Sequence, residues 1–374
     1  MQEEATGGDL ITSVLISVVL IFLLPNSMIE GFSGSLMRDG SMLTGTRYTI
    51  NQDALDSIAE DAEISIIGIG SSQMFKALDG RCVSDNLSNS TMVYNIAQSS
   101  SRPYTDMLHI PRIVNSNPEI LLIEISPNLL GNTSIASKEY IELRFKLDTM
   151  NQDSSDLGGW VDIIDPEHKD WVALDNYERM IFKQEYFPSA LEERLLRMLI
   201  AESAAKEMGS YGWIPDPSSD DWIDYLQTPI YPADIHGFDG KNSEEREIYN
   251  ATEMHKTANY KPSYRGSQAH AALDYEISTL LENEIQVILV GPPHHPSALE
   301  YVSDGQWDGV NETLTKYGHW TGVTVFDQTW ASGWVDDHFY DRNHLDDEGR
   351  IEFCHRLAPV IEQILNQEVV EWIL

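Results

Sequence analysis

Basic residues are scarce in this chain, where 24 Lys and Arg stand against 60 Asp and Glu and leave a formal net charge of −36 at pH 7. A surface this negative repels phosphate backbones, so we expect no nucleic acid among the partners of the protein. The acidic balance suits a salty medium or a cationic partner. We favour a generally solvated acidic surface over a specific cation site.

Cysteine is also rare, because the chain has only Cys82 and Cys354. Two cysteines are too few for a disulfide scaffold or a zinc site. Cys82 lies beyond the first predicted strand and Cys354 lies in the predicted C-terminal helix, and helices at these two places share a face in many doubly wound sheets. A disulfide is therefore an alternative, but we favour two separate buried thiols.

Charge is missing altogether from Leu10 to Ile29. Twenty helical residues rise roughly 30 Å, which is about the thickness of a bilayer core. A cleaved signal peptide has a basic region before its apolar run, whereas the first basic residue here is Arg38. We therefore predict an uncleaved transmembrane anchor at 10–29, with a short tail at 1–9 and a spacer at 30–60.

The side of the membrane is indicated by glycosylation motifs, because no basic flank allows the positive-inside rule to be applied. Asn-x-Ser/Thr sequons, the acceptors of N-linked glycans, are more numerous than composition alone predicts. We therefore predict a glycoprotein whose main domain lies outside the cytoplasm. The sequons begin at Asn86, Asn89, Asn132, Asn250 and Asn311.

Five short apolar runs are separated by segments of helical character. Near-continuous apolar strands are typical of a parallel sheet that helices cover on both faces. We therefore predict an α/β protein with a doubly wound, five-stranded parallel sheet. There is no internal repeat and no glycine-rich dinucleotide fingerprint. The predicted strands lie at 63–70, 91–97, 119–126, 285–291 and 323–327.

A long insertion divides the predicted sheet domain into a first part at 61–130 and a second part at 263–374. The insertion, 131–262, is rich in tryptophan and acidic residues. It contains a capping box, Ser189-Ala-Leu-Glu192, followed by leucines at helical spacing. We therefore predict a folded cap rather than a disordered loop.

Polar residues follow the predicted strands at their carboxyl ends, where ligands bind in an open parallel sheet. Their types are those that acyl transfer requires, because Ser attacks, His takes and returns its proton, Asp orients His, and Asn and backbone N–H groups stabilise the oxyanion. Such a site needs neither a cofactor nor a metal ion. The residues are Ser72, Ser99–Ser101, Asn128, His294, His295, Asp341 and His344.

The order Ser, Asn and then Asp-x-x-His near the C-terminus resembles the SGNH (GDSL-type) hydrolase superfamily, which implies a flavodoxin-like sheet. The most specific match is 339–349, Phe-Tyr-Asp-Arg-Asn-His-Leu-Asp-Asp-Glu-Gly, which is similar to the last block of that family. The first, second and third blocks are resembled by 70–72, 95–100 and 126–128. The anchor followed by Gly-Ser-Ser resembles a cell-envelope subgroup that includes D-alanyl transfer and alginate O-acetylation proteins.

The resemblance implies a role for each matched residue. Ser72 is the expected nucleophile, His344 is the expected general base and acid, and Asp341 is the residue expected to orient His344. The expected oxyanion donors are the backbone N–H groups of Ser72 and Ser100 and the side chain of Asn128.

Three positions depart from the family, because Ser71 stands where Asp is usual and Ser100 and Ser126 stand where Gly is usual. The envelope subgroup shares the first departure. The resemblance implies a membrane-anchored serine esterase or O-acyltransferase that acts on acyl esters of extracytoplasmic glycans or lipids, with a membrane acyltransferase as a candidate partner. The alternative is a catalytically inactive module that binds glycan or assembles envelope proteins.

Simpler interpretations compete for several of these residues. Ser72 alone fits a helix N-cap. For His294 and His295 we rank an exposed loop first, a substrate contact second and a metal pair third. A metal-dependent hydrolase built on the loop at 336–344 is the weakest hypothesis, because its ligands lack a regular spacing. The tryptophans of the insertion are more typical of a core than of a sugar-stacking face.

Overall fold

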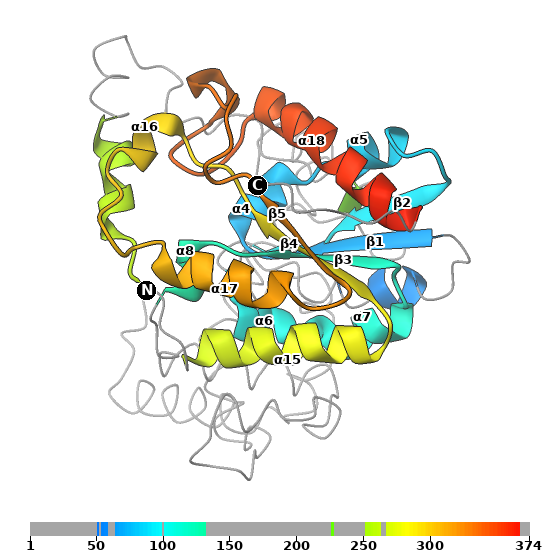
Figure 1. The fold of residues 1–374 in the computed structure, drawn as a ribbon. Coiled ribbons are helices and arrows are strands. Elements are labelled where there is room, and N and C mark those ends of the chain that lie inside the picture. The colour runs from blue at the N-terminus through cyan, green and yellow to red at the C-terminus, as the bar shows by residue number, and fades with distance from the viewer. Residues whose placement is uncertain are drawn as a thin grey trace, which may run out of the picture.

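The protein is built around a five-stranded parallel sheet with the strand order β2-β1-β3-β4-β5 (Figure 1). The predicted α/β class is therefore confirmed. The strands are β1 (Ile64–Ile69), β2 (Thr91–Asn95), β3 (Ile120–Glu124), β4 (Gln286–Gly291) and β5 (Val323–Asp327). The structure is a computed structural model that describes residues 51, 54–58, 64–98, 101–131, 226–227, 251–262 and 267–366.

Alternate residues of each central strand enter two separate hydrophobic clusters, one on each face of the sheet. In β3, Leu121 and Ile123 belong to one cluster, whereas Ile120 and Leu122 belong to the other. Every residue of this strand is buried. A strand that is covered on both faces has no side for polar residues, which explains the near-continuous apolar runs in the sequence.

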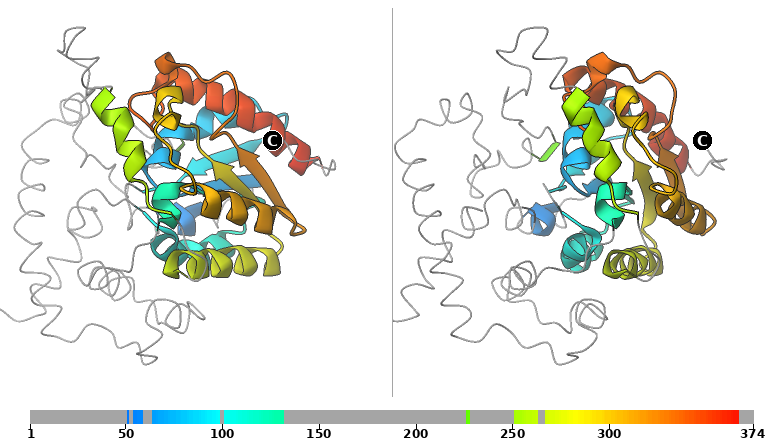
Figure 2. Two further views of the ribbon diagram at one scale, coloured as in Figure 1. Left: turned by 60° about the vertical axis from the view of Figure 1, so that its left-hand side comes forward. Right: turned by 90° about the vertical axis from the view of Figure 1, so that its left-hand side faces the viewer.

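Helices cover both faces of the sheet, as the two turned views show (Figure 2). One layer contains α4 (Ser72–Ala77), α5 (Gly80–Asp85) and α18 (Asp347–Leu365). The opposite layer contains α6 (Pro103–Asp106), η1 (Met107–His109), α7 (Ile110–Ser116), α15 (Gln268–Glu282) and α17 (Asp308–Gly318).

Short helices follow three strands at their carboxyl ends. They are α8 (Pro127–Leu130) after β3, α16 (Pro296–Leu299) after β4 and η4 (Asp336–His338) after β5. A fourth short helix, η3 (Lys256–Asn259), packs against α16. These elements surround the edge of the sheet at which a site is expected.

Two predicted regions lie outside the described residues. The anchor at 10–29 is one of them, and nearly all of the insertion at 131–262, including the helix expected after Ser189, is the other. Within the part of the chain that the structure describes, none of the helices combines the length and the apolar character needed to cross a bilayer.

Cys82 and Cys354 form a disulfide that joins α5 to α18. The expectation of two separate thiols is therefore wrong. Both helices lie on the same face of the sheet and pack against each other, which brings the two Cα atoms to 6.1 Å (Figure 1). A separation of this size permits a disulfide without movement of the backbone.

Candidate active site

Ser72 begins helix α4, directly beyond the carboxyl end of β1. Between them, Gly70 turns the chain with a φ of +145°, a conformation that residues with a side chain rarely adopt. Ser71 is the N-cap, because its hydroxyl oxygen accepts a hydrogen bond from the backbone N–H of Gln73 at 3.2 Å. The capping role that the sequence left open for Ser72 therefore belongs to Ser71.

Asp341 and His344 lie in the loop between η4 and α18. Oδ1 of Asp341 accepts hydrogen bonds from the backbone N–H groups of Asn343 at 3.0 Å and of His344 at 2.9 Å, so the carboxylate organises a tight turn. Nδ1 of His344 lies 2.9 Å from Oδ1 and 2.8 Å from Oδ2 of Asp341. Because a carboxylate accepts, we assign the imidazole proton to Nδ1, which leaves Nε2 as an acceptor.

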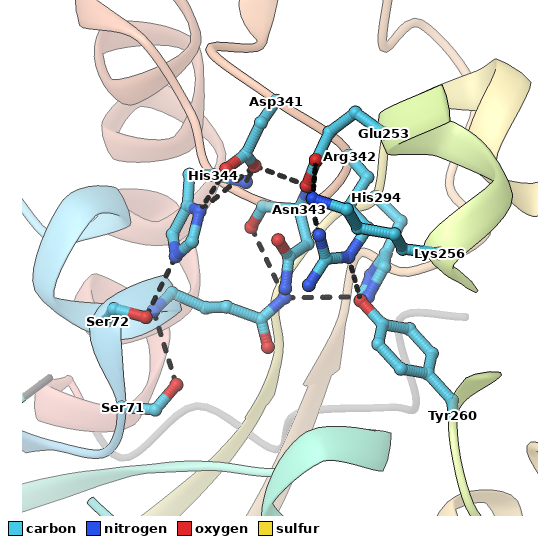
Figure 3. Close-up of polar contacts among 11 residues, drawn as sticks. Ser71, Ser72, Glu253, Lys256, Tyr260, His294, Asp341, Arg342, Asn343 and His344 are labelled. Atoms are coloured by element: carbon cyan, nitrogen blue, oxygen red, sulfur yellow. Dashed lines mark hydrogen bonds and ion pairs between the residues drawn. The ribbon is translucent and has the colours of Figure 1, made fainter. Parts of the chain in front are cut away.

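Ser72 and His344 come together at this edge of the sheet, with 2.8 Å between Oγ and Nε2 (Figure 3). The serine hydroxyl therefore donates to the imidazole, and the imidazole donates to Asp341. The side chains of His344 and Asp341 are 19% and 13% exposed, so the site is neither sealed nor fully solvated. In this arrangement a base is placed to remove the proton of a serine hydroxyl.

The negative charge of Asp341 is stabilised by its neighbours. Burial by itself raises the pKa of this carboxyl, but the adjacent His344 and the backbone N–H groups of Asn343 and His344 outweigh burial and lower the pKa below its usual value. Asp341 is therefore ionised at neutral pH. An ionised carboxylate beside Nδ1 stabilises the imidazolium that forms when His344 takes a proton.

A second buried carboxylate, Glu124 at the end of β3, lies against the turn that carries Ser72. It accepts hydrogen bonds from the backbone N–H groups of Ser71 and Met74 at 2.7 and 3.2 Å. It also accepts from the hydroxyls of Ser71 and Ser126 at 2.9 and 2.8 Å. Burial raises the pKa of Glu124 above its usual value, although these hydrogen bonds act in the opposite direction.

The motifs in the sequence do not identify Glu124, although a signal for it is present. It is the one charged residue in the apolar run 120–125. A carboxyl group in a strand that is buried on both faces requires hydrogen-bond partners, so its position predicts a polar cluster at the end of β3.

His294 lies against Gln73 of helix α4, and Gln73 connects this helix to the loop between η4 and α18. It is buried, and its Nε2 lies 3.4 Å from the side-chain amide nitrogen of Gln73, while its Nδ1 lies 3.3 Å from the carbonyl of Pro292. We assign Nδ1 as the donor and Nε2 as the acceptor. The amide of Gln73 also donates to the carbonyl of Asn343 at 3.2 Å. Burial lowers the pKa of His294 to about 4, so the imidazole is neutral at neutral pH.

His295 is buried as well, so the expectation that ranked an exposed loop first for both histidines is wrong. Nδ1 of His295 accepts from the backbone N–H of Ser297 at 3.1 Å and caps α16, and Nε2 lies 3.5 Å from Asp336. Burial lowers the pKa of His295. Among the described residues, no group of three or more His, Cys, Asp and Glu side chains is placed to hold a metal ion.

Arg342 joins the loop between η4 and α18 to the described end of the insertion, 251–262. Its guanidinium pairs with Glu253, which also pairs with Lys256 (Figure 3). Its Nε lies 3.4 Å from the hydroxyl of Tyr260. The last residues of the insertion therefore contact the segment that carries Asp341 and His344.

Asn128 lies in α8, beyond the carboxyl end of β3. Its exposed side chain lies beside the hydroxyl of Tyr260, and its backbone carbonyl accepts from Arg102 at 2.8 Å. The hydroxyl of Tyr260 thus lies between the predicted oxyanion residue Asn128 and Arg342 of the loop between η4 and α18. Ser100 lies outside the described residues, so its expected oxyanion role stays a prediction.

The structure thus brings Ser72, His344 and Asp341 into hydrogen-bond contact. His294 contacts Gln73, the residue after Ser72, and Asn128 lies beside Tyr260. Comparison with the models of known protein families finds no match, and neither does comparison with curated proteins. The function must therefore be argued from the geometry of these residues.

Proposed function

We propose that this protein is a serine esterase or O-acyltransferase in which Ser72 is the nucleophile. One observation carries the proposal, namely the chain of hydrogen bonds from Ser72 through His344 to Asp341, with 2.8 Å between Oγ and Nε2. A serine hydroxyl is a weak nucleophile until a base within hydrogen-bond reach removes its proton. A helix start or a surface loop requires no such relay of side chains.

The reaction divides into two half-reactions. Oγ of Ser72 attacks the acyl carbonyl while Nε2 of His344 takes its proton, and the imidazolium then gives that proton to the leaving alcohol. In the second half, His344 takes a proton from water or an acceptor hydroxyl, whose oxygen attacks the acyl-enzyme, and it then gives that proton to Oγ of Ser72 as the bond between the acyl group and Oγ breaks. Asp341 keeps the imidazole oriented throughout, and the N–H of Ser72 with Asn128 and Ser100 are the proposed oxyanion donors.

The fold supports an SGNH-like assignment within this proposal. The order β2-β1-β3-β4-β5 is that of flavodoxin-like doubly wound sheets, in which a ligand binds at the switch point between β1 and β3. Ser72 follows β1, and Asn128 follows β3. The predicted nucleophile and the predicted oxyanion donor therefore lie on either side of this switch point.

A location outside the cytoplasm is supported by two features. The disulfide between Cys82 and Cys354 suits an oxidising compartment, because cytosolic reductants keep most thiols reduced. The sequon asparagines Asn86, Asn89 and Asn311 are exposed and therefore accessible to glycosylation. With the predicted anchor at 10–29, we propose acyl esters of envelope glycans or lipids as the substrates.

A fluorophosphonate probe tests the nucleophile directly, because it labels activated serines. We expect the purified full-length chain to be labelled at Ser72, as located by peptide mass spectrometry. Ser72→Ala is expected to abolish labelling, whereas Ser332→Ala, which changes an exposed serine far along the chain, is expected to preserve it.

Two outcomes would contradict this proposal. Absence of labelling in folded wild-type protein would favour the inactive binding or assembly module. Labelling that persists in Ser72→Ala would assign the reactivity to another residue. Circular dichroism of each variant shows whether the protein that was tested is folded.

A further inference from the structure

Glu124 contacts the nucleophile turn on both sides of Ser72. Its Oε2 accepts the backbone N–H of Ser71 at 2.7 Å and the backbone N–H of Met74 at 3.2 Å. The hydroxyl of Ser71 lies 2.9 Å from both carboxylate oxygens. One side chain from β3 therefore holds the residue before Ser72 and the residue two positions after it.

The groups around this carboxylate are arranged as donors. Backbone N–H groups can only donate, and Ser71 Oγ already accepts from the N–H of Gln73, which directs its own proton toward Glu124. The hydroxyl of Ser126 donates a hydrogen bond to Oε1 of Glu124 at 2.8 Å. An acceptor at this position is required, because removing it would leave buried N–H groups without partners.

The backbone around Gly70 is shaped to fit the same carboxylate. A Cβ atom at Gly70 would lie 2.5 Å from Cβ and 2.7 Å from Oε2 of Glu124, closer than any unstrained contact. The absence of a side chain at Gly70 therefore allows Glu124 to approach the turn. This contact positions Ser72, because Ser71 and Met74 on either side of it cannot shift while their backbone N–H groups remain bound to Glu124.

We infer that Glu124 is a positioning residue for the nucleophile, holding the Ser71–Met74 turn so that Oγ of Ser72 stays within reach of His344. The inference rests on the proposed role of Ser72. Glu124 touches neither Ser72 Oγ nor His344 in the hydrogen-bond network, so it acts through the backbone rather than on the reacting atoms. Displacing a reacting group by about 1 Å is enough to reduce a rate about 100-fold.

Two substitutions separate the position of the acceptor from its charge. Glu124→Gln keeps the length of the side chain and one acceptor oxygen, and this oxygen can accept from both backbone N–H groups. The NH₂ group of the glutamine then faces the hydroxyl of Ser126, which can turn to accept a hydrogen bond from it. Glu124→Asp keeps the charge but is one methylene shorter, so its oxygens cannot reach both N–H groups. Positioning therefore predicts that Gln preserves more activity than Asp.

The experiment measures kcat and KM for p-nitrophenyl acetate, and the rate of fluorophosphonate labelling, in the full-length protein. Rates are divided by the folded fraction from circular dichroism. We expect Glu124→Gln to remain within about 10-fold of wild type in kcat and Glu124→Asp to fall about 100-fold, with KM nearly unchanged in both. If Glu124→Asp does not fold, Glu124→Met, which is of similar length but has no acceptor oxygen, replaces it in the comparison.

The outcomes distinguish this inference from the proposed function. Wild-type protein that is neither labelled nor active would contradict the role of Ser72 itself. Active wild type together with Glu124→Asp or Glu124→Met at full rate per folded molecule would overturn the role of Glu124. A larger loss in Glu124→Gln than in Glu124→Asp would also overturn it, because the charge would then matter more than the position of the acceptor.

Discussion

Oγ of Ser72 lies 2.8 Å from Nε2 of His344, although 272 residues separate the two in the chain. Cys82 and Cys354, each ten positions further along, are separated by the same 272 residues and are joined covalently. The disulfide therefore joins the two segments that supply the proposed nucleophile and the proposed base. These segments enclose the whole insertion, so the site forms only when both parts of the sheet domain have assembled.

The first prediction concerns this disulfide. Replacing both Cys82 and Cys354 by Ser is expected to lower the free energy of unfolding by about 2–4 kcal/mol, because the cross-link restricts the unfolded chain over a long loop. Urea unfolding measures the difference. Wild type with a reductant should approach the double variant, whereas the double variant should not respond to the reductant. Equal stability of the two oxidised proteins would contradict the prediction.

The second prediction concerns Asp341. Asp341→Asn is expected to lower kcat about 10⁴-fold, because a carboxamide no longer fixes the proton on Nδ1 of His344 or stabilises the imidazolium. Steady-state kinetics with p-nitrophenyl acetate measure this loss. Asp337→Asn, at an exposed acid of the preceding helix η4, is the matched control and should retain activity. A comparable loss in both variants would indicate a general effect of loop charge.

The low pKa of Asp341 also restricts the pH dependence of activity. The neighbouring His344 and the backbone donors keep this pKa below its usual value in spite of burial, so protonation of Asp341 does not contribute to any loss of activity between pH 5 and 7. A loss of activity in that window must come from another group.

The third prediction concerns Tyr260, whose hydroxyl lies between Asn128 and Arg342. Tyr260→Phe removes the hydrogen bond from Arg342 but keeps the ring that packs against Trp307 at 5.7 Å between centroids. We expect kcat to fall about 5-fold, which corresponds to about one hydrogen bond, with little change in thermal stability. Tyr301→Phe, at a more exposed tyrosine, is the control and should leave kcat unchanged. Equal kinetics in wild type and Tyr260→Phe would exclude this link to the site.

The strands and the three residues of the proposed relay could be predicted because they depend on local patterns. Each strand is an apolar run bounded by turn residues, and the observed ends differ from the predicted ends by a few positions at most. Residue type and the position of strand ends predicted that polar side chains would gather there, and the resemblance to the SGNH superfamily singled out Ser72, Asp341 and His344 among them. The observed Ser72–His344 contact follows from that order only because parallel strands align their carboxyl ends.

Other features depend on which segments become neighbours, which no local pattern specifies. Glu124 looks like any acid at a strand end until the turn at Ser71 is placed beside it. Tyr260 lies at the end of the insertion, and nothing in its sequence surroundings indicates Arg342 as a partner. Cys82 and Cys354 were expected on one face of the sheet, but their pairing requires the distance between two helices.

The last prediction concerns the stability of the fold in acid, through His294. Burial lowers the pKa of His294 from 6.5 in the unfolded chain to about 4 in the folded protein. Between these values the unfolded chain binds the proton and the folded protein does not, so stability falls as the pH falls from 6.5 to 4. The free energy of unfolding that is lost in this way totals about 3 kcal/mol, and the loss is complete below pH 4.

Urea unfolding at pH 7.5 and pH 4.5 measures this effect as the difference between the two pH values. His294→Gln keeps a donor and an acceptor at the site but has no proton to bind, so the difference should shrink by about 2–3 kcal/mol relative to wild type. His355→Gln, at an exposed histidine of α18, controls for the loss of a histidine and should preserve the wild-type difference. Because the two pH values are compared within each variant, any destabilisation from lost packing is the same at both values and cancels in the difference. An unchanged difference in His294→Gln would show that His294 binds its proton equally well in the folded and unfolded chain.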